Sequence, residues 1–205
     1  GEDFLGNKVT QGDAIYLDLE SRQHRVAERV ERLCGRELPN TLLVGHQSPR
    51  LEDNFYGMLE GLLKERPDTR LVVVDTLGRV KGPGRGGENA YEADTRILGQ
   101  AQRFALDRGI CLMLIHHLRK SVGGFKESDV FERVNGSTGL TGACDTMMVL
   151  DSRRQDDQAR LYVDGRDVPS RQLALSFDGG VWTLLSNDGA EWERQQHYRD
   201  SPLPG

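Results

Sequence analysis

Apolar residues along the first 120 positions form short continuous runs separated by longer amphipathic stretches. Continuous runs indicate strands that are buried on both faces, as in a parallel sheet covered by helices. Such strands are expected at 14–20, 41–45, 71–75 and 111–115. Apolar residues at helical spacing predict helices at 22–34, from Phe55 until Pro67, and from Ala93 until Gly109. Strands and helices therefore alternate as in an α/β protein.

The pattern changes beyond residue 145 to short strands of alternating apolar and polar residues, which are typical of antiparallel pairing. These strands are expected at 146–150, 161–163, 173–177 and 181–185, with a tight turn at 178–180. The predicted fold class is α/β, a mainly parallel sheet flanked by helices with antiparallel strands at the C-terminal end. One domain is expected over 1–187, followed by a polar C-terminal tail over 188–205.

Charge and composition narrow the classes of protein. The 205 residues carry a net charge of −5, whereas a protein that coats nucleic acid as a lone monomer is usually basic. The longest apolar runs hold roughly five residues against about 20 for a membrane helix, so no membrane partner is expected. Cys111 and Cys144 adjoin apolar runs and are expected to be buried, and with no C-x-x-C motif a cytoplasmic location is expected.

Polar residues follow three of the expected strands: Glu20, Asp75, and His116 with His117. The carboxyl ends of parallel strands meet at one edge of the sheet, which is where ligands bind. Each residue alone is as consistent with a helix cap or a loop hydrogen bond, but the set favours a functional site. An apolar strand that ends in Asp75-Thr76 is the Walker B arrangement, in which the carboxylate holds the hydration shell of nucleotide-bound Mg²⁺.

Two other motifs were sought. No G-x-x-x-x-G-K-[ST] phosphate loop occurs, and the nearest glycine spacing, at 82–87, is followed by Glu88 where the phosphate-binding lysine belongs. A zinc site at the histidine pair lacks a third ligand at plausible spacing, so a metal-dependent hydrolase ranks last among the hypotheses.

Taken together, the segments resemble the RecA-like ATPases of the plasmid RepA and phage replication type, which are relatives of the hexameric replicative helicases. The resemblance covers about residues 1–186 and rests on the order and spacing of its pieces. The matching pieces are 4–6, 12–20, 71–77, 114–120, 135–146, 165–169, 175–178 and 182–185.

The resemblance implies a role for each strand-end residue. Glu20 is expected to be the general base that polarises the attacking water, and Asp75 the acid that anchors Mg²⁺. His117 matches the sensor of the γ-phosphate. Arg166 matches an arginine supplied in trans to the nucleotide of the neighbouring subunit. The predicted nucleotide-binding residues are Asp75, Thr76 and His116.

The resemblance also implies a ring, expected to be a hexamer, that acts on DNA, expected to be single-stranded. The loops at 79–89 and 119–134 match the positions that face the central channel in ring-forming relatives. Their predicted phosphate contacts are Arg79, Lys81, Arg85, Arg119, Lys120 and Lys126, although acidic neighbours dilute this charge.

In this family the P-loop precedes the segment at 4–6 by roughly one helix. The chain is therefore expected to be a fragment without its first strand, P-loop and first helix, from a parent that binds Mg²⁺ and ATP. The alternative is a degenerate, non-catalytic RecA-fold protein that regulates or loads another factor on DNA. A P-loop in the genomic sequence immediately upstream of Gly1 would favour the ATPase, and its absence would favour the regulator.

Because the main phosphate cradle is missing from these 205 residues, we expect the chain by itself to bind Mg-ATP poorly or not at all. Isothermal titration calorimetry of the 205-residue chain with Mg-ATP measures this directly. The expected result is no tight binding, and micromolar affinity would contradict the expectation.

Overall fold

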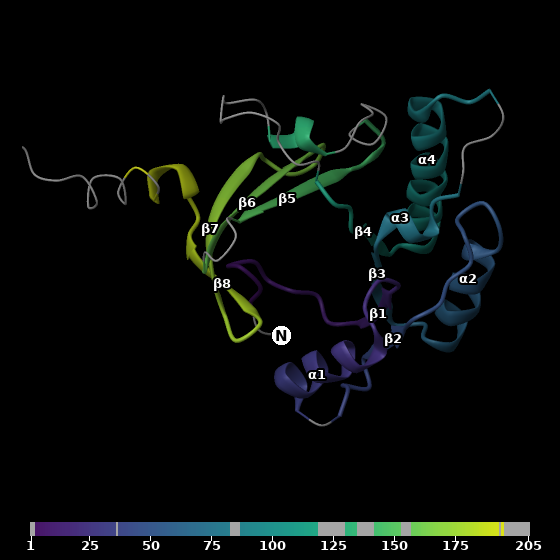
Figure 1. Ribbon diagram of the computed structural model, residues 1–205, viewed down its shortest axis with the longest axis horizontal. Coiled ribbons are helices and arrows are strands. Elements are labelled where there is room, and N and C mark those ends of the chain that lie inside the picture. The colour runs from purple at the N-terminus through teal and green to yellow at the C-terminus, as the bar shows by residue number, and fades with distance from the viewer. Residues whose placement is uncertain are drawn as a thin grey trace, which may run out of the picture. The chain divides into compact units, whose positions relative to one another are not determined.

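The computed structural model describes residues 3–35, 37–82, 87–118, 130–134, 142–152, 157–192 and 194. These residues form two compact units (Figure 1). The first holds the described residues of Val9–Cys144, and the second holds those of Glu2–Lys8 and Asp145–Gly205.

The first unit contains a parallel sheet of four strands in the order β2-β1-β3-β4. The strands are β1 (Asp13–Asp18), β2 (Leu42–Gly45), β3 (Thr69–Asp75) and β4 (Cys111–Leu114). The helices are α1 (Gln23–Cys34), α2 (Phe55–Glu65), α3 (Leu77–Val80) and α4 (Ala90–Arg108), and a 3₁₀ helix spans Val130–Arg133. Figure 1 shows α2 and α4 on one side of the sheet and α1 on the other.

One face of this sheet carries the core of the unit. Ile15 of β1 and Val72 of β3 point into it together with Phe55 of α2, and all three are fully buried. The helix α4 begins at a capping box in which Asn89 and Glu92 satisfy each other's backbone N–H groups. It ends at Gly109, whose φ of 62° suits the left-handed conformation that glycine adopts freely.

The second unit contains an antiparallel sheet in the order β5-β6-β7-β8. Its strands are β5 (Thr146–Ser152), β6 (Gln158–Gly165), β7 (Arg171–Asp178) and β8 (Val181–Ser186). Gly179 and Gly180 connect β7 to β8 with φ values of 57° and 99°, as a two-residue hairpin turn requires. Buried apolar side chains from β5, β6 and β7 line its inner face, among them Val149, Ala159 and Leu175.

These elements confirm the predicted fold class, a helix-flanked parallel sheet with C-terminal antiparallel strands, and the antiparallel strands form a separate sheet. The prediction that Cys111 is buried is wrong, because β4 is an outer strand of the described sheet and Cys111 is exposed. Cys144 is half-buried and packs against the core. The division at residue 187 stays a prediction. Among the described residues, no helix is long and apolar enough to cross a membrane.

Candidate functional site

The carboxyl ends of β1, β3 and β4 bring Glu20, Asp75 and His117 to one edge of the parallel sheet. The pairing continues past the strand ends: the Leu19 N–H donates to the Asp75 carbonyl at 2.7 Å, and the Ile115 N–H donates to the Val74 carbonyl at 3.0 Å. His117 Nε2 then lies 3.1 Å from Glu20 Oε2. Two of the strand-end groups predicted from the sequence are therefore in direct contact.

Two cationic or potentially cationic side chains face the Glu20 carboxylate. His117 contacts Oε2, and Arg79 Nε of α3 lies 3.7 Å from Oε1. The Arg79 and His117 side chains are 58% and 73% exposed. Exposed ion pairs contribute only about 0–1 kcal/mol, so a water molecule or an incoming ligand displaces them at little cost. The Glu20 carboxylate is thus oriented without being locked.

A buried aspartate fixes the turn that carries Glu20. The Asp18 side chain is fully buried at the end of β1, and its Oδ1 accepts hydrogen bonds from the N–H groups of Glu20 at 3.3 Å and Ser21 at 2.7 Å. Its Oδ2 lies 3.9 Å from Arg29 Nη1 and accepts no hydrogen bond from the residues that the structure describes. Asp18 therefore determines where the backbone of Glu20 sits.

A tyrosine orients the Walker B carboxylate. The Tyr16 hydroxyl of β1 donates to Asp75 Oδ2 at 2.6 Å. Burial and this hydrogen bond raise the pKa of Tyr16 well above its usual value, so the hydroxyl stays protonated and remains a donor at neutral pH. Buried Thr76 follows Asp75. Mg²⁺ bound to a nucleotide usually takes one or two protein carboxylates and keeps several waters, so this donor set fits the ion.

The second histidine lies in a different environment from the first. Burial, together with the neighbouring His117 and Lys81, lowers the pKa of His116, so its imidazole is neutral at pH 7. Lys81 forms an ion pair with buried Asp94 and thereby joins the end of α3 to α4. The roles of His116 at the nucleotide and of Lys81 at DNA stay predictions.

The remaining predicted residues lie elsewhere. Arg166 belongs to the second unit, where its Nη1 is 3.7 Å from Asp145 Oδ1 and its backbone N–H donates to the Asp145 carbonyl at 2.9 Å. Four of the six predicted DNA contacts lie outside the described residues, namely Arg85, Arg119, Lys120 and Lys126.

Sequence reasoning missed Tyr16 and Asp18, and it assigned Arg79 to a loop although Arg79 lies in α3 beside Glu20. The period of two along β1 was the available signal, because it places Tyr16 and Asp18 on the face shared with Asp75. The spacing from Asp18 to Ser21 was a second signal, since aspartate often bonds backbone N–H groups two or three residues further on.

Replacing Tyr16 by Phe tests whether the hydroxyl holds Asp75. At neutral pH we expect Tyr16→Phe to lower the free energy of unfolding by about 1–2 kcal/mol, because a hydrogen bond to a charged group is lost. Urea denaturation measures this, with exposed Tyr91→Phe as the matched control.

The same pair gives a pH dependence with a defined sign. Since the pKa of Tyr16 is higher in the folded than in the unfolded chain, its contribution is complete below about pH 10 and is lost at higher pH. The difference between wild type and Tyr16→Phe should therefore shrink above about pH 10. A difference that stays constant or grows would contradict the assignment.

Comparison with known proteins is consistent with this edge. A family model described as an AAA domain matches residues 1–123. The solved ATPase domain of a phage helicase is 12% identical, with 85% of this chain and 75% of that chain covered and a TM-score of 0.69. The RadB recombinase is 17% identical, with 83% and 78% covered and a TM-score of 0.54.

A DnaB-like replicative helicase, solved to show its interactions with primase, is 12% identical with a TM-score of 0.63; the alignment covers 85% of this chain and 51% of the helicase. This chain therefore spans about half the length of that helicase. No curated protein sequence matches significantly. With a family match over more than half of its length and these structural matches, the chain belongs to the AAA domain family and has a RecA-like ATPase fold.

Proposed function

We propose that this chain is part of a RecA-fold ATPase that couples ATP hydrolysis to work on DNA in replication or repair, as in a RepA-like helicase. The observation that carries the proposal is the edge where Glu20 contacts His117 and the adjacent strand ends in Asp75. The matched structures, a helicase ATPase domain, a replicative helicase and a recombinase, support the same class of work.

In the proposed reaction Glu20 accepts a proton from the water that attacks the γ-phosphate of ATP. Asp75 holds Mg²⁺ through its hydration shell, and Tyr16 keeps the Asp75 carboxylate in place. When bound, Mg²⁺ neutralises the charge that the phosphates carry and develop during transfer. His117 contacts both Glu20 and, in the proposal, the γ-phosphate, so it reports the presence of that phosphate to the general base.

The proposed working form is a ring, with the nucleotide between subunits. Arg166 of one subunit would then stabilise the transferring phosphate at its neighbour, as arginine fingers do. Single-stranded DNA would bind the basic residues of the two channel loops. The weak contact of Arg79 with Glu20 is compatible with this role, since an exposed ion pair is readily exchanged for a phosphate.

A second candidate is a non-catalytic RecA-fold regulator or loader on DNA. The observation that favours it is the absence of a G-x-x-x-x-G-K-[ST] motif from the 205 residues. Both candidates predict DNA association, but only the ATPase predicts that turnover depends on Glu20.

The test replaces Glu20 by Gln in the protein with its whole natural sequence. Removing a general base typically costs about 10²–10⁴ in rate, so we expect turnover of ATP to fall by that factor while Mg-ATP affinity stays within about threefold. Glu65→Gln, on an exposed part of α2, is the matched control. Loss of nucleotide binding would assign Glu20 a structural role, and a wild-type protein without ATPase activity would favour the regulator.

A further inference from the structure

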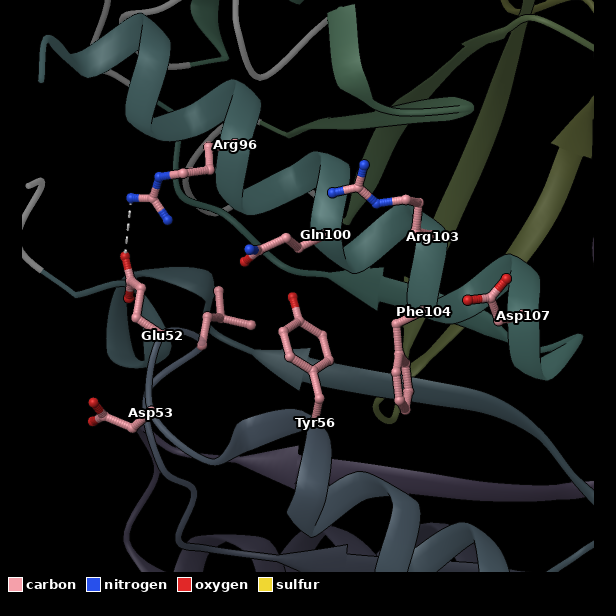
Figure 2. A pocket seen from close by; sticks show the side chains of 9 residues that line it. Glu52, Asp53, Tyr56, Arg96, Gln100, Arg103, Phe104 and Asp107 are labelled. Carbon is pink, nitrogen blue, oxygen red and sulfur yellow. Dashed lines mark ion pairs between the residues drawn. The ribbon is translucent and has the colours of Figure 1, made fainter.

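A groove of about 450 Å³ lies between the start of α2 and one face of α4, in the first unit (Figure 2). Glu52 and Tyr56 line it from the α2 side, and Arg96, Arg103 and Phe104 line it from α4. Its volume is in the range of sites that bind small molecules or short peptide segments.

Three buried polar atoms in this groove lack a hydrogen-bond partner among the residues that the structure describes: Glu52 Oε1, the Tyr56 hydroxyl oxygen and Arg96 Nη1. Figure 2 shows the Tyr56 hydroxyl directed toward α4 and the ion pair between Arg96 and Glu52, whose Nη2 and Oε1 atoms are 3.6 Å apart. Buried polar groups are normally paired, so three unpaired ones at a single groove indicate a missing partner.

The chemistry of these atoms selects the partner's functional group. Arg96 Nη1 can only donate, and Glu52 Oε1 as a carboxylate oxygen can only accept. Burial, and then the charge of Glu52, raises the pKa of Tyr56 to about 12, so its hydroxyl keeps the proton and can donate. An amide group, with one carbonyl acceptor and one N–H donor, complements this set.

Charge argues against a phosphate ligand. Three carboxylates line the groove, those of Glu52, Asp53 and Asp107, against the arginines Arg96 and Arg103. Arg96 is already engaged by the Glu88 carboxylate through Nε at 2.8 Å and Nη2 at 2.9 Å. Phosphate sites are usually dominated by positive charge, so a neutral amide suits this groove better.

The other end of the groove adds an apolar wall and one available cation. The rings of Tyr56 and Phe104 lie 5.1 Å apart and form the wall. Arg103 is exposed and forms no ion pair with any described residue. From Arg96 to Asp107 the groove follows eleven residues of α4, or about 16 Å at 1.5 Å per residue. An extended chain of about five residues spans the same length.

We propose that this groove binds an extended peptide segment of a partner protein. The segment places backbone amides on Glu52, Tyr56 and Arg96, an apolar side chain against Tyr56 and Phe104, and an acidic side chain on Arg103.

The groove also adjoins the predicted DNA-binding segment. Glu52 Oε2 accepts a hydrogen bond from the Gly82 N–H at 3.0 Å, and a Cβ at Gly82 would lie only 2.5 Å from the same oxygen. Arg96 binds Glu88 at the other end of this segment. A peptide in the groove therefore contacts both residues that fasten the segment between 82 and 88.

The probe is a phage-displayed library of random seven-residue peptides, selected on the wild-type 205-residue chain. Selected peptides are then synthesised, and their affinities are measured by fluorescence anisotropy. We expect them to share an acidic residue and an apolar residue. Because neither nucleotide nor DNA is needed, the outcome is independent of the proposed ATPase function.

Two variants locate the binding. Arg103→Glu should weaken the selected peptides at least tenfold, and a peptide with lysine in place of its acidic residue should recover the loss. Tyr56→Phe should weaken binding without lowering the melting temperature, because the hydroxyl has no partner in the free chain. Arg25→Glu, the same charge reversal on exposed α1, is the control and should have no effect.

Three outcomes would overturn the proposal. The first is that no peptide is enriched, and the second is that the enriched peptides bind all the variants equally. The third is self-association of the chain that Arg103→Glu abolishes while no peptide is selected, which would make a second copy of the chain the occupant.

Discussion

Parallel pairing between β1 and β3 is the constraint on which the arrangement at the carboxyl edge depends. The register sets Asp18 beside Asp75, and the Leu19 N–H extends the ladder by one bond to the Asp75 carbonyl. In this register Tyr16 lies close enough to Asp75 to donate its hydroxyl proton, and Glu20 emerges next to the Walker B carboxylate. Because side chains alternate along a strand, a slip by one residue would move Tyr16 and Asp18 to the opposite face.

Strength of fixation differs among the groups of this edge, and the difference matches their proposed roles. The backbone of Glu20 is held firmly, by hydrogen bonds to the buried carboxylate of Asp18. Its side chain is held only by exposed contacts to Arg79 and His117, which are weak in water. A general base needs a fixed origin and a carboxylate that can turn toward water, and this combination supplies both. The groove between α2 and α4 shows the opposite balance, with buried polar atoms that lack partners among the described residues.

Much of the fold was predictable from the sequence because periodicity reports burial directly. The continuous run before Asp75 indicated a covered parallel strand, and the common edge of parallel strands indicated that Glu20, Asp75 and His117 lie near one another. The contacts of Tyr16 and Asp18 were not predictable in the same way, since they depend on cross-strand register and side-chain rotamers. The exposure of Cys111 depends on which strand is outermost, and apolar content does not encode this order.

The most direct test of the central claim is a structure of the protein with its whole natural sequence, bound to Mn²⁺ and a non-hydrolysable ATP analogue. The anomalous signal of manganese locates the metal without reference to any assumed role. We predict the metal within about 5 Å of the Asp75 carboxylate, linked through its hydration shell, with Glu20 facing the terminal phosphate. A metal and nucleotide bound away from the ends of β1 and β3 would contradict the account.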